Sequence, residues 1–142
     1  MRSVAKNIFI TVIVLTGIIF TSGVHDLFAY RESLYVPRVD YLNPQNGAVI
    51  EIGPRGSVTF SWKMVPIPGG GRHSYRFTLY KAEGYDVVES AVLGPDTYSF
   101  DVPAGKFEPG QRYRWQVKQR DTQTMQWSEY DNWYFKVAES AK

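Results

Sequence analysis

Apolar and polar residues alternate over three segments of the chain, residues 58–62, 75–79 and 113–117. A period of two is typical of a β-strand that buries one of its faces. Shorter and less regular apolar runs predict five further strands, over residues 36–41, 48–52, 87–93, 98–102 and 133–137. No window beyond residue 29 shows a helical period, so the chain is predicted to be all-β.

Glycine, proline and asparagine separate these runs at regular intervals. Residues 43–47 form one predicted turn, in which Asn46-Gly47 supplies the positive φ that a tight turn needs. Gly53-Pro54 ends the next strand, and residues 66–71 form a loop. About seven short strands separated in this way predict a two-sheet antiparallel sandwich.

The first 29 residues differ from the rest in being charged at the start and then continuously apolar. Arg2 and Lys6 precede an apolar run over residues 8–20, which is shorter than the roughly 20 residues that a membrane-spanning helix needs. We predict a signal peptide cleaved after Ala29, with Gly23 as the second candidate. The alternative is an uncleaved anchor whose apolar run extends to Val24.

Either interpretation places the remainder outside the cytoplasm, as a periplasmic, extracellular or membrane-tethered protein. In the predicted layout, residues 30–35 are a lead-in, residues 36–138 a single domain and residues 139–142 a tail. The membrane is then contacted only through the N-terminal segment, and only if that segment is retained.

Composition excludes several classes of function. The 142 residues include no Cys, which excludes disulfides, thiolate chemistry, thiol-ligated metal sites and a bacterial lipoprotein anchor. The formal net charge of +2 is too small to indicate a nucleic-acid partner, because such binders usually carry a strongly basic domain. The aromatic content of 15% favours strands, since aromatic side chains suit a half-buried pleated surface.

Residues 107–117 resemble the stretch that leads into the F strand of fibronectin type III domains. Pro109 follows Phe107 by two positions, Tyr113 follows four later, and alternating apolar residues come next. The resemblance covers residues 36–138 and implies that the Tyr113 hydroxyl bonds to upstream backbone at a tyrosine corner. It also implies core positions for Trp62 and Trp115. Residues 43–52 resemble the opening of bacterial Ig-like domains equally well, and the chain has no Arg-Gly-Asp sequence.

Residues suited to catalysis or metal binding are sparse. His73 is the only histidine beyond residue 29, and the neighbouring Ser74 points to the opposite face of a strand. Gly69-Gly70-Gly71 lacks the Lys-Ser/Thr and following helix of a phosphate-binding loop. We therefore predict no enzyme activity and no cofactor.

Three acidic residues near the C-terminus, Asp121, Glu129 and Asp131, invite comparison with a calcium site. Their spacing matches no oxygen-ligand motif with its glycine and distal glutamate. We interpret them as solvated loop carboxylates and predict no metal.

One sheet face is predicted to be basic. If Tyr113, Trp115 and Val117 point inward, the intervening side chains point outward. The residues expected there are Arg76, Thr78, Tyr80, Arg112, Arg114, Gln116, Lys118, Arg120, Tyr134 and Lys136. Such a face either keeps the sheet soluble or binds an acidic protein, an anionic cell-wall polymer or lipid headgroups.

Trp127-Ser128 resembles the Trp-Ser element of fibronectin type III domains in cytokine receptors. The resemblance implies that Trp127 stacks between Arg112 and Arg114. The other interpretation is a loop aromatic that fills a partner pocket or, with Tyr130 and Tyr85, stacks on a sugar.

These patterns predict an exported, non-enzymatic interaction module that binds an unknown protein or cell-envelope polymer. The alternatives are a carbohydrate-binding module that uses the loop aromatics, and a subunit of an envelope assembly whose lead-in, residues 30–37, pairs with a neighbour.

Overall fold

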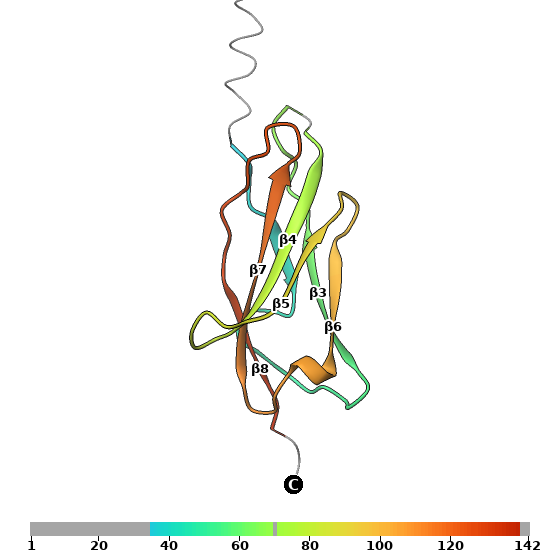
Figure 1. Cartoon of the computed structure of the whole chain (residues 1–142), viewed down its shortest axis with the longest axis vertical. Helices are drawn as coiled ribbons and strands as arrows, with labels where there is room; N and C mark the ends of the chain where they lie inside the picture. The colour runs from blue at the N-terminus through green and yellow to red at the C-terminus, as the bar shows by residue number, and fades with distance from the viewer. Residues whose placement is uncertain (1–34, 70, 140–142) are drawn as a thin grey trace, which may run out of the picture. The chain divides into compact units, whose positions relative to one another are not determined.

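Eight β-strands and one 3₁₀ turn make up the part of the chain that the computed structural model describes, residues 35–69 and 71–139 (Figure 1). The predicted signal peptide and residues 30–34 of the lead-in lie outside the described residues. Among the residues described, no helix is long and apolar enough to cross a membrane. The elements are β1 (Asp40–Asn43), β2 (Ala48–Ile50), β3 (Ser57–Lys63), β4 (His73–Lys81), β5 (Val87–Leu93), β6 (Ser99–Pro103), η1 (Ala104–Lys106), β7 (Arg112–Asp121) and β8 (Trp133–Val137).

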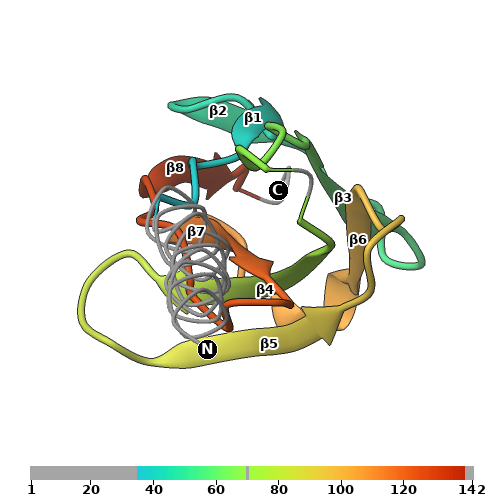
Figure 2. The same ribbon diagram turned by 90° about the horizontal axis from the view of Figure 1, so that it is seen from above.

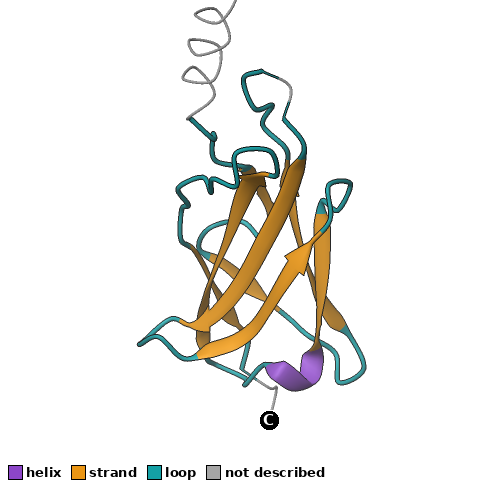
Figure 3. Ribbon diagram, turned by 45° about the horizontal axis from the view of Figure 1, so that its top comes forward, coloured by secondary structure: helices purple, strands orange, loops and turns teal. Residues whose placement is uncertain are grey.

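The strands form two sheets that face each other across an aromatic core (Figure 2). One sheet has the order β1-β3-β6 and the other the order β2-β8-β7-β4-β5. All pairs are antiparallel except β2 with β8, which is parallel. Loops join the strands at both ends of the sandwich (Figure 3). The predicted all-β two-sheet sandwich is confirmed.

Strand positions agree with the hydrophobic pattern, whereas some strand ends do not. Strands β5 and β8 have the predicted bounds. Strand β1 begins at Asp40 rather than at residue 36, because Pro37 has no N–H to donate to a ladder. Strand β7 continues four residues beyond Val117 to Asp121. Its last inward positions are the buried polar residues Gln119 and Asp121, which end the apolar alternation without ending the strand.

The core is built from aromatic rings contributed by both sheets. The Phe60 ring centroid lies 4.9 Å from that of Phe77, 5.2 Å from that of Trp115 and 5.7 Å from that of Phe135. Trp62 and Trp115 are fully buried. Tilted and edge-on aromatic pairs of this kind add about 0.5–1.5 kcal/mol each beyond the apolar area they bury. The inward faces of the strands are therefore held rigidly, and their outward faces are fixed with them.

Tyr113 closes a corner before β7. Its hydroxyl accepts a hydrogen bond from the backbone N–H of Glu108 at 2.8 Å, five residues upstream. Phe107 packs edge-on against the Tyr113 ring, with centroids 5.2 Å apart. This corner sets the start of β7, and with it the alternation of every residue that follows in that strand.

Candidate protein-interaction face

Four cationic side chains follow one another on the outward side of β7. Tyr113, Trp115 and Val117 are fully buried, so the even-numbered residues of this strand point away from the core. The neighbouring strand β4 adds an exposed arginine to the same side. We call this set the basic face; its members are Arg76, Arg112, Arg114, Lys118 and Arg120.

Aromatic rings hold two of these cations near the start of β7. The Arg114 guanidinium lies 4.5 Å from the ring centroid of Tyr80 and 5.3 Å from that of Tyr85. Arg114 also donates a hydrogen bond to the carbonyl of Gly84, at 3.2 Å. Arg112 lies 5.9 Å from the Tyr134 ring. Through Gly84 and Tyr85, the β4–β5 loop is therefore held against Arg114 on the basic face.

Trp127 lies between two arginines, but not the two that the sequence suggested. Its ring centroid is 4.6 Å from the guanidinium carbon of Arg76 and 5.1 Å from that of Arg120. An isolated antiparallel bridge between Arg120 and Trp127 fixes the tryptophan at the far end of β7. Arg112 lies eight residues before Arg120 in β7, or about 27 Å from it at 3.4 Å per residue, and cannot reach the Trp127 ring. The predicted stacking on Arg112 and Arg114 is therefore wrong.

The loop aromatics proposed for sugar recognition are also occupied by cations. The ammonium nitrogen of Lys118 lies 4.4 Å from the Tyr130 ring centroid. With Arg76 and Arg120 on Trp127 and with Arg114 on Tyr85, each of the three rings already stacks on a cation. A sugar that stacked on the same ring faces would have to displace these cations.

Like charges stand opposite each other at two positions of this sheet. Arg76 of β4 is directly opposite Lys118 of β7, and Arg112 of β7 is directly opposite Lys136 of β8. Among the described residues, no carboxylate forms an ion pair with any member of the basic face, and Lys136 pairs only distantly with Glu139, at 3.7 Å. Like charges directly opposite on neighbouring strands destabilise a sheet by a few tenths of a kcal/mol to about 1 kcal/mol.

Gln116 lies at the centre of this side of the sheet, but it is not the exposed residue that the alternation predicted. Only 9% of its surface is exposed, and its amide donates a hydrogen bond to the Tyr80 hydroxyl at 3.0 Å. Its cross-strand neighbour Thr78 is 6% exposed. A period-two pattern reports the direction of a side chain and not how much of its surface neighbouring side chains cover.

The acidic residues near the C-terminus have structural partners. Arg38 donates to Glu129 at 2.8 Å and to Asp131 at 2.7 Å. The hydrogen bond with Glu129 and the charge of Asp131 raise the pKa of the Arg38 guanidinium above its usual value. Asp121, only 1% exposed, accepts from the N–H of Gln123 at 2.9 Å. Within residues 35–69 and 71–139, no three His, Cys, Asp or Glu side chains form a group that could hold a metal.

His73 is the first residue of β4 and is half-buried. Its ring stacks on that of Tyr75, with centroids 6.5 Å apart. The residue directly opposite is Asp121, whose carboxylate is engaged by the turn that follows.

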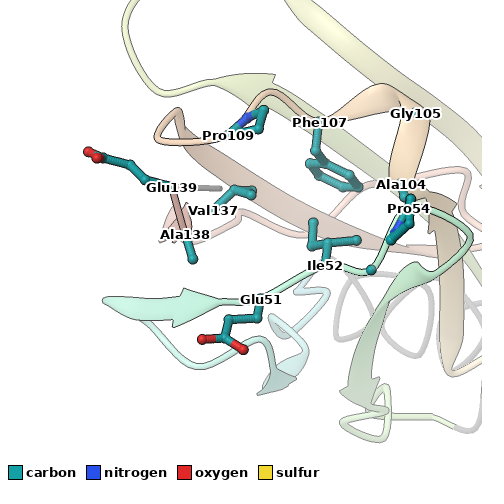
Figure 4. A pocket seen from close by; sticks show the side chains of 11 residues that line it. Glu51, Ile52, Pro54, Ala104, Gly105, Phe107, Pro109, Val137, Ala138 and Glu139 are labelled. Atoms are coloured by element: carbon teal, nitrogen blue, oxygen red, sulfur yellow. The ribbon is translucent and has the colours of Figure 1, made fainter. Parts of the chain in front are cut away.

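A cleft of about 510 Å³ that the sequence does not predict lies at one end of the sandwich (Figure 4). The segment after β2, the segment after β6 and the end of β8 line it. Ile52, Phe107 and Val137 supply apolar side chains, and Glu51 and Glu139 supply carboxylates. No local pattern marks this cleft, because its walls come from three segments far apart in the chain.

No protein-family model and no curated protein matches this chain. Among solved structures, the chain is similar to a computationally redesigned β-sandwich protein, with a TM-score of 0.52 and 15% identity over 76% of this chain and all of the other. It is also similar to the FN1–FN3 domains of chicken CNTN1, with a TM-score of 0.49, 10% identity and coverage of 72% of this chain and 34% of that one. The first likeness, with the strand order and the Tyr113 corner, establishes a fibronectin type III-like β-sandwich.

Proposed function

We propose that this domain is a non-enzymatic protein-interaction module that binds an acidic surface of another protein through the basic face. The observation that carries the proposal is the placement of like charges at opposed positions, Arg76 with Lys118 and Arg112 with Lys136. A fold gains nothing from such pairs, since opposite or neutral partners would pack equally well and repel less. A carboxylate placed between the two cations of a pair would relieve the repulsion.

The stacking of these cations on rings favours binding. A cation–π contact leaves the full positive charge in place while it restricts the long side chain. Ordering a flexible arginine or lysine on binding otherwise costs about 0.5–1.5 kcal/mol for each side chain. The basic face therefore presents charges that are already positioned.

The composition of the surface favours a protein partner over a sugar. Arginine, tyrosine and tryptophan are the residues most enriched at protein–protein interfaces and among their energetic hot spots. Here Trp127, Tyr80 and Tyr134 alternate with arginines, and their ring faces are already in contact with cations. A fibronectin type III-like fold is also consistent with a protein-interaction module.

We further propose that the module acts outside the cytoplasm. The basis is the sequence of residues 1–29, with its charged start, short apolar run and small residue at Ala29.

A charge-reversal experiment tests the proposed binding face. Protein from an exporting host is immobilised and used to capture proteins from the envelope fraction of its source organism. Arg76→Glu with Lys118→Glu is compared with Arg55→Glu plus Lys63→Glu, two exposed residues outside that sheet that undergo the same change in charge. Thermal unfolding verifies that each variant is folded.

We expect the basic-face reversal to abolish capture of an acidic protein that the control variant retains, and raised salt to weaken that capture. A partner that is captured equally by all variants and at high salt would contradict the proposal.

A further inference from the structure

Strand β5 forms one edge of the five-stranded sheet. It pairs with β4 on one side, and no described strand pairs with its other side. An edge strand exposes a row of backbone N–H and C=O groups, and natural proteins usually disrupt such a row with proline, lysine, a bulge or a short strand. Strand β5 has seven residues with neither proline nor lysine, and its one register shift lies near its start.

The other sheet edges are less open. Strand β2 has three residues, and β1 has four with a register shift and Pro44 directly after it. Strand β6 ends in Pro103. Among the described strands, β5 therefore offers the longest continuous edge.

Hydrogen bonds around β4 reveal which backbone groups of β5 point outward. The Phe77 carbonyl accepts from the Ser90 side chain at 3.3 Å, and the Lys81 N–H donates to the Asp86 carbonyl at 3.0 Å. The odd-numbered residues of β4 therefore direct their backbone toward β5. Antiparallel pairs alternate between hydrogen-bonded and non-hydrogen-bonded positions, so the residue opposite Phe77, Ala91, bonds to β4.

Ser90 and Val92 flank Ala91 and consequently direct their N–H and C=O groups to the free edge. The Ser90 N–H has a partner only in the carboxylate of its neighbour Glu89, at 3.3 Å, which agrees with this assignment. On the outward side, Val92 is 69% exposed and Val87 is 57% exposed. Backbone groups and apolar side chains are thus both available along this edge.

We infer that β5 accepts an extended acidic segment of the partner protein as an additional strand. The inference rests on the proposed function, since it specifies how the acidic partner binds. Val92 is directly opposite Arg76 in β4. An added strand would lie two strand spacings, or about 10 Å, from β4. That distance is about one Debye length at 0.1 M ionic strength and slightly more than one Debye length at physiological salt, so the field of Arg76 at the added strand is only partly screened. Glutamate or aspartate at the outward positions of that strand would gain from this field.

A second copy of this chain fits the edge less well. Pairing of β5 with β5 would place two basic faces side by side in one continuous sheet. Each face carries five cations, Arg76, Arg112, Arg114, Lys118 and Arg120, with no ion pair to a described carboxylate. Charge repulsion therefore favours an acidic segment over self-association.

The test uses a fluorescent, end-capped peptide of alternating glutamate and valine, about eight residues long, as the probe, and the full chain from an exporting host. Val92→Pro removes an N–H that faces solvent, a position where an edge strand tolerates proline. We expect the peptide to bind the Val92→Pro variant about tenfold more weakly, the effect of losing one or two backbone hydrogen bonds. Val92→Thr, which keeps the N–H and the β-branched shape, is the matched control.

Amide hydrogen exchange provides an independent readout. In the free protein, the amides of Ser90 and Val92 should exchange faster than those of Ala91 and Leu93, and the peptide should slow the exchange of Ser90 and Val92. A peptide N-methylated along one edge should not slow it, which keeps the test available if Val92→Pro fails to fold.

The results separate this inference from the proposed function. Equal binding by wild type and Val92→Pro, or absent protection at Ser90 and Val92, would overturn strand addition. Equal protection by a lysine–valine peptide would overturn the inference that the added strand is acidic. If strand addition at β5 fails but Arg76→Glu with Lys118→Glu still abolishes partner capture, the proposed binding through the basic face stands.

Discussion

The Tyr41 hydroxyl occupies the place where the backbone of Val117 would otherwise pair with a neighbouring segment. It accepts from the Val117 N–H at 2.9 Å and donates to the Asp131 carbonyl at 2.8 Å. The β7–β8 register pairs Trp115 with Trp133, and two residues further it would bring Val117 opposite Asp131. A side chain from β1, in the opposite sheet, thus replaces one rung of the ladder.

Removing this hydroxyl should destabilise the fold. Tyr41→Phe leaves the buried backbone groups of Val117 without a partner, and we expect a loss of about 1–3 kcal/mol in the free energy of unfolding. Tyr98→Phe, at a residue 42% exposed, is the control and should change stability by less than about 0.5 kcal/mol. Urea denaturation measures both. Similar effects for the two variants would show that the Tyr41 bridge is unimportant.

Stability should fall at alkaline pH through the same residue. Burial raises the pKa of Tyr41 to about 12, and burial also raises that of Tyr75 to about 12. Because the folded-state pKa exceeds the unfolded value of about 10, the stabilisation is complete below pH 10 and is lost as the pH rises toward 12. Unfolding midpoints measured from pH 7 to 12 should show this decline, and Tyr41→Phe should reduce it. An unchanged decline in that variant would rule out Tyr41 as its source.

The Trp127 stack can be measured by a double-mutant cycle. Trp127→Ala and Arg120→Ala should couple by about 0.5–1 kcal/mol, the range for partly exposed cation–π pairs. Trp127→Ala with Arg112→Ala is the matched cycle and should show no coupling, because the two residues lie at opposite ends of β7. A coupling energy between Trp127 and Arg112, with none between Trp127 and Arg120, would instead support the Trp127–Arg112 contact that the sequence suggested.

Tyr113 and Gln116 should both contribute to stability. Tyr113→Phe removes the part-buried hydrogen bond from the N–H of Glu108 and should cost about 1 kcal/mol. Gln116→Ala removes the hydrogen bond to the Tyr80 hydroxyl from a covered position and should cost about 1 kcal/mol. Gln123→Ala, at an exposed turn residue, should cost less than about 0.5 kcal/mol. Chemical denaturation measures these losses in the free energy of unfolding. Equal losses for Gln116→Ala and Gln123→Ala would mean that the burial of Gln116 does not stabilise the fold.

Processing of the N-terminus is a separate prediction. A chain produced in an exporting host should begin near Tyr30, because the apolar run over residues 8–20 ends before a small residue at Ala29. N-terminal sequencing and intact mass measure this directly. A membrane-bound product that retains Arg2 and Lys6 would instead identify an uncleaved anchor.

The strands and their inward faces follow from local pattern. Alternation at Val58, Phe60 and Trp62 requires one buried face wherever the strand is placed, because successive side chains leave a strand on opposite sides. The same rule placed Arg114 and Lys118 on one outward side. The Tyr113 corner was implied by the resemblance of residues 107–117 to fibronectin type III domains, and its partner Glu108 lies five residues upstream in that same stretch.

Only the tertiary structure decided the contacts between segments far apart in the sequence. Trp127 stacks on Arg76 because β4 and β7 are neighbours, a pairing that leaves no trace in either segment alone. Gln116 donates its hydrogen bond to Tyr80, 36 residues away in the chain, and the Tyr41 hydroxyl reaches Val117 across 76 residues of chain. The sequence by itself determined which face of each strand is apolar, because that depends on a period of two. The opposed cations and the open edge of β5 depend on which strands are adjacent, and tertiary packing alone determines this.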